Sequence, residues 1–233
     1  MSNYSKIKDI ILKLNSEELL KEKLYIVGGT VPYLISNIMS NREHSDIDII
    51  VAANDMNVVR EYLKNNNLYI RDFDSITFDY NKNKIDYGID CIIDGIIVNF
   101  APFEIVDNTM IQKNFLIKKN SGVNALVTVT IENVKIEDCT TTVIVDQVKI
   151  KTYNLEMVRV MKEKSNKQKD TVDIEVIDKY GYDEKKYNDL KIKTNNMKFK
   201  VFPKSKLLRI FMRWITICKD IFTLKINNVK EFW

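Results

Sequence analysis

The chain has 233 residues, 45% of them hydrophobic and 29% charged, so it has enough apolar material for a buried core and is not a disordered tail. The net charge of +4 is too small to indicate an obligate nucleic-acid-binding protein. The single histidine, His44, excludes metal sites and proton relays built from several histidines. Three widely spaced cysteines and the lack of a signal-peptide or membrane-spanning run predict a cytoplasmic protein with reduced thiols.

The first 65 residues alternate between helical and strand patterns. Apolar spacing, turn residues and polar breaks predict one or two helices over residues 4–22, a strand at 24–27, a helix from about residue 30, a strand at 46–51 and a helix at 56–65. The glycine pair Gly28-Gly29 forms a turn between the first strand and the second helix, and Pro32 fits the first turn of that helix.

Residues 68–106 have strand character. The dipeptide Asp94-Gly95 predicts a two-residue hairpin turn between two apolar runs. With those two residues as the turn, Asp90 lies opposite Asn99 and both side chains lie on one face of the sheet.

The second half is expected to be mainly helical. Further strands are predicted at 126–131 and 142–151, and helices at 154–164, 170–180 and 206–224, whereas residues 183–202 have no clear pattern. We therefore predict an α/β (α+β) fold in which a mixed β-sheet is flanked by helices. Residues 1–150 would form its mixed half, and residues 151–233 a mainly helical region that closes a cleft.

Chemistry is concentrated between residues 26 and 51. Gly28 and Gly29 allow a close approach of the backbone to a ligand, and the following helix start with the Thr30 hydroxyl offers an anion site. Asp46 and Asp48 stand two apart on a predicted strand, so both carboxylates lie on the same face. Two such close like charges favour a bound cation, and Mg²⁺ binds through one or two carboxylates together with substrate phosphates.

This segment resembles the nucleotidyltransferases of the DNA polymerase beta superfamily, whose signature is a Gly-Gly or Gly-Ser pair followed by Asp-x-Asp between apolar residues. The resemblance implies the nucleotidyltransferase fold. It also implies that Gly28, Gly29 and Thr30 hold a nucleoside triphosphate and that Asp46 and Asp48 bind metal.

The run from Arg42 to Asp48 is similar to the pattern Arg-x-(His/Thr)-x-Asp-Ile-Asp of aminoglycoside, lincosamide and AbiEii-like nucleotidyltransferases, which implies a role for Arg42 in nucleotide binding. The tRNA CCA-adding members carry Val-Arg-Asp after the glycines. Here the residues are Val31-Pro32-Tyr33, which disfavours that activity.

The family also uses a third carboxylate on a neighbouring strand, as a metal ligand or as a base. The position aligned with it is Asn99, so we assign the metal-binding and catalytic role to Asp90, which faces Asn99 across the hairpin. Asn99 itself and Glu104 stay open as alternatives for this role, although the odd offset of Glu104 from Asn99 puts it on the other face of a regular strand.

A second resemblance covers two consecutive helices, in which family members carry a lysine, a basic loop and then Lys-Asp-x-x-Asp-Ile. The matching residues are Lys162 or Lys164, Lys167, Lys169, Asp170 and Asp173. The resemblance implies that Lys162 and Lys169 neutralise triphosphate charge.

Together these features predict an enzyme that transfers a nucleoside monophosphate from an NTP such as ATP to an acceptor hydroxyl, with a two-metal Mg²⁺ site. A small, antibiotic-like acceptor is slightly favoured. The alternatives are an AbiEii-like enzyme that modifies tRNA or protein, and a degenerate nucleotide-binding module without activity. No membrane partner is expected, and a homodimer is left open.

Overall fold

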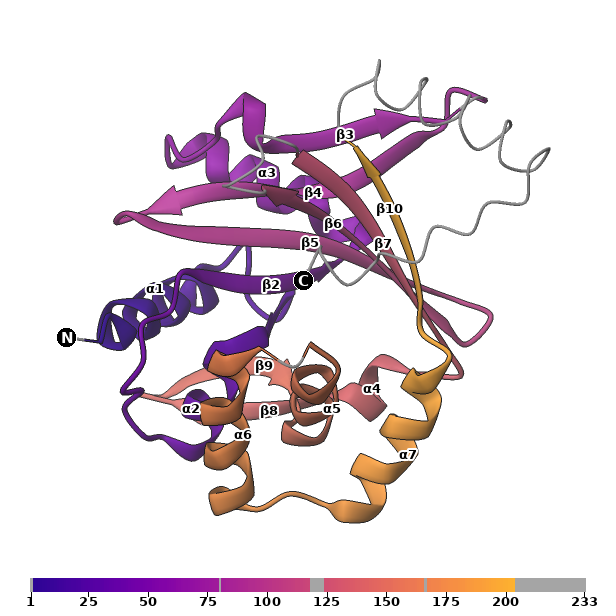
Figure 1. The fold of residues 1–233 in the computed structure, drawn as a ribbon. Coiled ribbons are helices and arrows are strands. Elements are labelled where there is room, and N and C mark those ends of the chain that lie inside the picture. The colour runs from indigo at the N-terminus through magenta and orange to yellow at the C-terminus, as the bar shows by residue number, and fades with distance from the viewer. Residues whose placement is uncertain (1, 80, 118–123, 166, 204–233) are drawn as a thin grey trace.

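The computed structural model describes residues 2–79, 81–117, 124–165 and 167–203 (Figure 1). Its helices are α1 (Tyr4–Ser16), α2 (Val31–Ser36), α3 (Met56–Asn65), α4 (Ile136–Cys139), α5 (Leu155–Ser165), α6 (Gln168–Tyr180) and α7 (Glu184–Asn195). Its strands are β1 (Leu24–Val27), β2 (Asp46–Ala52), β3 (Asp74–Phe78), β4 (Lys84–Ile93), β5 (Ile96–Val106), β6 (Thr109–Ile117), β7 (Asn124–Glu132), β8 (Thr140–Val145), β9 (Val148–Tyr153) and β10 (Lys198–Pro203).

All the described strands join one mixed sheet, which confirms the predicted fold class. The order is β10-β7-β6-β5-β2-β1-β9-β8, and β4 joins β5 to β3. The pairs β2–β5 and β1–β9 are parallel, and the others are antiparallel. Helices α2, α5, α6 and α7 gather beside β8 and β9, and α1 lies at the N-terminal side of β2 (Figure 1).

The sheet forks at β5. One edge of β5 pairs with β2 from Ile97 to Phe103. The other edge pairs first with β4, up to Phe100, and then with β6, from Phe103 onward. Pro102, which has no N–H to donate to a ladder, lies between the two ladders, as expected for a proline inside a strand.

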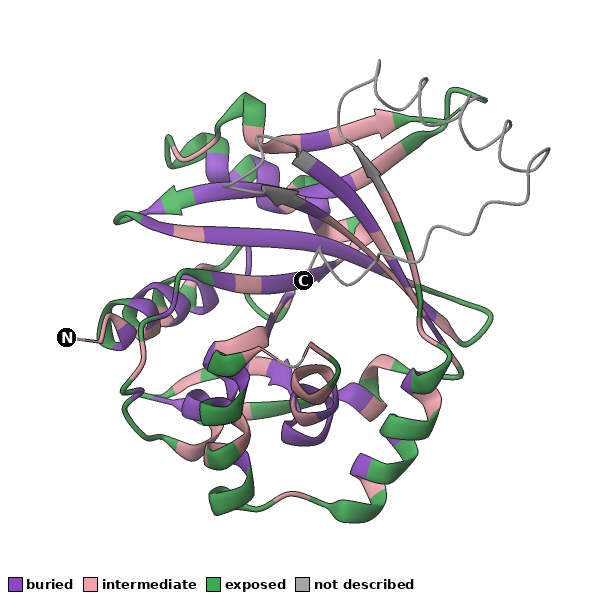
Figure 2. Cartoon of the chain, viewed as in Figure 1, coloured by how far each residue is buried: buried purple, intermediate pink, exposed green. Residues whose placement is uncertain are grey.

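Buried and more exposed side chains alternate at the start of β2, and the buried ones belong to the core. Ile47 and Ile49 are fully buried, whereas Asp46 is exposed and Asp48 half-buried. Successive side chains of a strand point to opposite faces, so the isoleucines enter the core and the carboxylates share the other face. Purple bands in Figure 2 show this burial continuing through β2, β4 and β5.

Several predicted elements are confirmed, among them the strand at 24–27, the helix at 56–65 and the hairpin turn at Asp94-Gly95. The single strand predicted at 142–151 is wrong, because β8 and β9 form a hairpin there that turns at Asp146 and Gln147. Strand β6, helix α7 and strand β10 were not predicted. The helix predicted at 206–224 lies outside the described residues. Within the described part of the chain, no helix is both long enough and apolar enough to cross a membrane.

Candidate active site

Three polar side chains form a row across neighbouring strands. Asp48 on β2 is the register partner of Asn99 on β5, and Asn99 is the partner of Asp90 on β4. Paired residues share a face, so the three side chains and Asp46, two positions before Asp48, lie on one side of the sheet. The register predicted between Asp90 and Asn99 is confirmed, and the Asn99 amide donates a hydrogen bond to Asp90 Oδ1 at 2.5 Å.

Gly28 stands against this row. Its φ of +76° lies in the left-handed region, and a Cβ built on it would come within 2.6 Å of Asp48 Oδ2. Both the conformation and the space therefore require glycine. The turn after β1 therefore brings its backbone into contact with the Asp48 carboxylate.

The surroundings of Asp48 raise the pKa of its carboxyl group. Burial and the neighbouring Asp46 carboxylate raise the pKa of Asp48 to about 7, against the opposing effect of Lys162 and Lys169. A carboxyl group with such a pKa gains strongly when a positive charge comes close.

The donor set fits a divalent cation that arrives with a triphosphate. The described residues contain no cluster of three or more His, Cys, Asp or Glu side chains placed to hold a metal ion. They do offer the Asp46 and Asp48 carboxylates together with Asn99 Oδ1, a buried oxygen without a hydrogen-bond partner. Mg²⁺ commonly takes one or two carboxylates and completes its shell with water and substrate phosphates.

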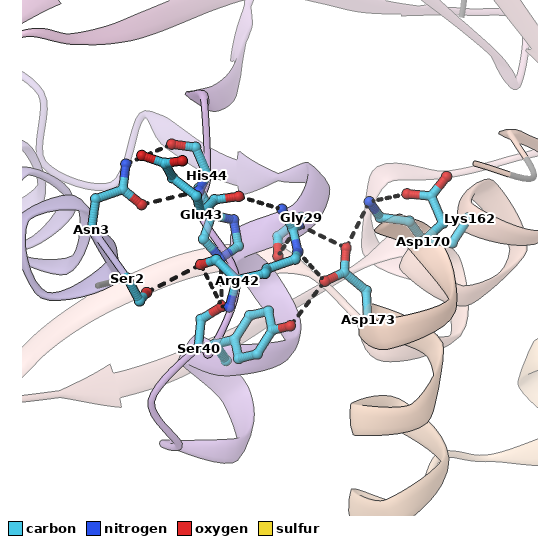
Figure 3. Close-up of polar contacts among 11 residues, drawn as sticks. Ser2, Asn3, Gly29, Ser40, Arg42, Glu43, His44, Lys162, Asp170 and Asp173 are labelled. Carbon is cyan, nitrogen blue, oxygen red and sulfur yellow. Dashed lines mark hydrogen bonds and ion pairs between the residues drawn. The ribbon is translucent and has the colours of Figure 1, made fainter. Parts of the chain in front are cut away.

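Asp173 on α6 connects the helices to the glycine turn (Figure 3). It is fully buried and accepts two hydrogen bonds from Arg42, at 2.7 and 2.8 Å. It also pairs with Lys162 Nζ at 2.8 Å and accepts a hydrogen bond from the Tyr33 hydroxyl at 3.0 Å. The Arg42 guanidinium occupies the space beside Gly29, where an added Cβ would lie 2.1 Å from Arg42 Nη2. Arg42 and Lys162, both predicted to bind nucleotide, are thus paired with an internal carboxylate.

Sequence reasoning identified Asp173 as a motif match but missed its structural role, and it missed Tyr33 entirely. Lys162 also pairs with Asp170 at 2.7 Å, and Asp170 accepts from the Lys167 backbone N–H at 3.2 Å. The contacts of Asp173 with Arg42 and Tyr33 span 131 and 140 residues of chain, so no local sequence pattern predicts them.

Lys169 differs from Lys162. It is exposed, and its ammonium group makes no ion pair with any residue that the structure describes. Its charge nevertheless lowers the pKa of Asp48, which places it near the carboxylate row. Of the other lysines in the motif, Lys164 donates to the Thr194 carbonyl.

Two further candidates are Thr30, on the glycine turn, and Glu104, on β5. Thr30 is 2% exposed, and its hydroxyl has no hydrogen-bond partner among the described residues. Glu104 lies five residues beyond Asn99 on β5 and pairs with Lys113 at 2.6 Å. The structure therefore brings together Asp46, Asp48, Asn99 and Asp90, but not Glu104.

His44 is part of an aromatic cluster. It is 3% exposed, its Nε2 lies 2.8 Å from Ser40 Oγ, and its ring packs against Tyr4 and Tyr33. Asn3 forms two hydrogen bonds with the His44 backbone and so holds the start of α1 to this loop. Burial lowers the pKa of His44 to about 4, and the nearby Arg42 adds to the effect.

His44 should therefore make stability depend on pH. The folded state favours the neutral ring, so this contribution is complete above pH ~6.5 and is lost as the pH falls toward 4. Between pH 7 and 4.5, we expect the wild type to lose about 2 kcal/mol more unfolding free energy than His44→Gln. Urea unfolding at both pH values measures this difference, and equal losses in the two proteins would refute it.

No protein-family model matches the sequence, and no curated protein sequence matches it. Several solved structures are similar to the chain, and the following are three of them. The solution structure of the antibiotic-resistance factor ANT(2'')-Ia is 11% identical, with a TM-score of 0.49, over 96% of this chain and 100% of that one. The crystal structure of ANT(2")-Ia in complex with adenylyl-2"-tobramycin is 12% identical, with a TM-score of 0.49, over 82% and 95%. An antigenic nucleotidyltransferase-like protein from Paracoccidioides brasiliensis is 14% identical, with a TM-score of 0.36, over 76% and 74%.

The sequence identities of these three structures to the chain are 11–14%, and their TM-scores are below 0.5. A function therefore has to be argued from the residues of the site itself.

Proposed function

We propose that the chain is a Mg²⁺-dependent nucleotidyltransferase that moves a nucleoside monophosphate from an NTP to an acceptor hydroxyl. The observation that carries the proposal is the close packing of Gly28 against Asp48, in line with Asp46 and Asn99. This arrangement places the backbone of the glycine turn, which can approach a phosphate, beside Asp46 and Asp48. The carboxyl groups of these two residues form no ion pair with any residue that the structure describes. A binding site for a triphosphate with its cation explains both features.

Each residue then has a defined task. Asp46 and Asp48 would hold the cation, Gly28 and Gly29 would let the triphosphate approach the turn, and Lys169 would neutralise charge on the departing pyrophosphate. The cation, when bound, would screen the triphosphate charge and favour loss of the acceptor hydroxyl proton. The acceptor oxygen would form a bond to the α-phosphorus while the bond to pyrophosphate breaks in line, and the hydroxyl proton would pass to solvent water.

We favour a small, antibiotic-like acceptor. The run from Arg42 to Asp48 fits this class as well as AbiEii-like enzymes, and the mild net charge of +4 gives little attraction for a polyanion such as tRNA. An AbiEii-like enzyme acting on tRNA or protein is the alternative within the same chemistry.

Labelled NTPs test the proposal. The full chain is incubated with Mg²⁺ and each α-labelled NTP, together with either an aminoglycoside and lincosamide mixture or total tRNA. Label on a small molecule is the expected result, and label on tRNA would reject the small-molecule acceptor. If no product forms and neither NTP nor Mg²⁺ raises the melting temperature, the nucleotidyltransferase proposal itself fails.

One observation favours a non-enzymatic module. Asn99 occupies the place next to Asp48 where the resemblance expects a carboxylate, so the charge of the row is smaller than in the family pattern. A nucleotide-dependent rise in melting temperature without transfer to any acceptor would support this alternative.

The two lysines of the motif should respond differently to mutation. Lys169→Ala removes an exposed cation near Asp48, so we expect ATP affinity in the presence of Mg²⁺ to fall about tenfold with little change in stability. Lys162→Ala removes a partner of two carboxylates and should lower the melting temperature. Calorimetric titration and thermal unfolding measure both effects.

The control is Lys6→Ala, which removes an exposed lysine of α1 and should change neither quantity. Unchanged ATP affinity in Lys169→Ala would remove this lysine from the site.

A further inference from the structure

We infer that the side-chain oxygen of Asn99 is a ligand of the divalent cation and that Asp90 is the positioning residue that aims it. This inference rests on the proposed function, because it concerns the cation of that site. It differs from the family pattern, in which a carboxylate takes the third place.

The side chain of Asn99 has a buried oxygen that accepts no hydrogen bond from the described residues. Asn99 is 8% exposed, and its Oδ1 has no hydrogen-bond partner, whereas its Nδ2 donates to Asp90. Leaving a buried acceptor unpaired costs about 1–3 kcal/mol. Such groups are rare in folded proteins and often mark the place of an ion, a water or a ligand.

The hydrogen bond to Asp90 fixes the orientation of the Asn99 side-chain amide. A carboxylate accepts hydrogen bonds, so the NH₂ end of Asn99 has to face Asp90 and the oxygen end has to face away from it. Because Asn99 lies between Asp90 and Asp48 in the row, its oxygen is left on the side of β2. A rotated amide would set its oxygen against the Asp90 carboxylate. Asp90 therefore fixes the one orientation that presents an oxygen toward Asp48.

The spacing of β2, β5 and β4 places Asn99 closer to Asp48 than Asp90 is. Neighbouring strands lie about 4.8 Å apart, so β4 is roughly 10 Å from β2, with β5 between them. Asp90 is 4% exposed, and Asn99 stands between it and Asp48. A cation on Asp46 and Asp48 reaches Asn99 before it reaches Asp90. The site then holds two negative charges and one neutral oxygen, which favours a cation that arrives with a triphosphate.

Mn²⁺ is a suitable probe, because the electron paramagnetic resonance spectrum of Mn²⁺–ATP changes when the complex binds to a protein, without requiring turnover. The full chain is titrated into preformed Mn²⁺–ATP, beginning with wild type and Asn99→Leu, which keeps the side-chain size and removes the oxygen. We expect Asn99→Leu to weaken Mn²⁺ binding at least tenfold. Asp90→Asn replaces an acceptor-only carboxylate by an amide that can also donate, so it no longer fixes the orientation of Asn99. It should weaken binding about 10- to 100-fold, as loss of an orienting partner does in other metal sites.

The exchange variant Asn99→Asp/Asp90→Asn distinguishes a role of the pair in orienting an oxygen toward Asp48 from a purely structural role. It keeps one amide and one carboxylate in contact but turns the carboxylate toward Asp48. We expect it to bind Mn²⁺ at least as tightly as wild type, although it contains the same substitution that harms Asp90→Asn alone. A purely structural role of the pair does not predict this rescue.

The matched control is Asn114→Leu. Asn114 lies on β6, a strand that carries none of the residues of the row, and its Oδ1 is also buried without a hydrogen-bond partner among the described residues. Its replacement should leave Mn²⁺ affinity unchanged. Thermal unfolding identifies any variant that does not fold, and if Asn99→Leu is one of them, the exchange variant decides.

The outcomes distinguish the two proposals. Wild-type affinity in Asn99→Leu, combined with lost affinity in Asp48→Asn, overturns the role of Asn99 and leaves the proposed function intact. An exchange variant that binds as weakly as Asp90→Asn also overturns it. If wild type binds Mn²⁺ no better than Asp48→Asn with ATP present, the proposed function fails first.

Discussion

Replacing Asp48 by Asn should abolish most of the nucleotidyl transfer while making the folded protein more stable. Loss of a carboxylate that holds the cation is expected to lower the transfer rate by about 100- to 1000-fold. The gain in stability follows from the raised pKa of Asp48. Above its ordinary value near 4, the ionised group destabilises the fold, and this penalty grows until the pH reaches about 7.

A neutral amide removes that penalty. Because Asp48 is half-buried and water screens part of the charge, we expect a gain of about 1–2 kcal/mol at pH 7.5, less than the full pKa shift corresponds to. Urea unfolding and a labelled-NTP assay measure the two effects on the same preparation. Asp9→Asn, an exposed carboxylate of α1, should change neither.

The opposite signs make the prediction specific. A variant that loses both activity and stability would show that Asp48 has a structural role, and a variant that keeps transfer would remove Asp48 from the chemistry.

Replacing Asp173 by Asn should destabilise the protein by about 3–5 kcal/mol. Asp173 is fully buried and lies between the charges of Arg42 and Lys162, so its loss leaves two cations without their shared partner. Guanidinium unfolding at pH 7.5 gives the free-energy change. Because the same contacts join α6 to the glycine turn, ATP affinity should also fall.

Two comparisons isolate the cause. Asp178→Asn removes a half-exposed partner of Arg159 and should cost less than about 1 kcal/mol. Asp173→Leu combined with Arg42→Met removes the carboxylate together with Arg42, whereas Lys162 keeps its ion pair with Asp170, and it should recover most of the stability lost in Asp173→Asn. A double variant as unstable as Asp173→Asn would indicate that shape and hydrogen bonds, rather than uncompensated charge, dominate this contact.

The parts of the fold that could be predicted are those with local signals. The hairpin turn at Asp94-Gly95 fixed the contact between Asp90 and Asn99, because a two-residue turn determines the register of its strands. The hairpin of β8 and β9 was missed because its turn residues, Asp146 and Gln147, adopt positive φ without a glycine to mark them. Helix α7 was missed because it buries only Tyr187, Leu190 and Thr194, too few residues to give an apolar stripe.

The candidate site likewise has parts that follow from local sequence patterns and parts that do not. The position of Asp46 and Asp48 on one face follows from the period of a strand. The pairing of Arg42 with Asp173 does not follow from any period, because the two residues meet only after β9, α5 and α6 have folded back beside the glycine turn. Sequence alone therefore assigned Arg42 and Lys162 to the nucleotide, whereas in the structure both are bound to an internal carboxylate.

The fork at β5 has a consequence for cooperativity. The outer strands β6, β7 and β10 are long and well paired with one another, with nine residue pairs between β6 and β7, but β6 joins β5 through only four, from Phe103 to Val106. The ladder that carries Asn99 lies on the other side of Pro102. We therefore expect the outer strands to open as a unit, with amide protons exchanging faster than those of β2 and the first half of β5. Equal protection of both regions in native-state hydrogen exchange would show that the fork does not divide the sheet into separate folding units.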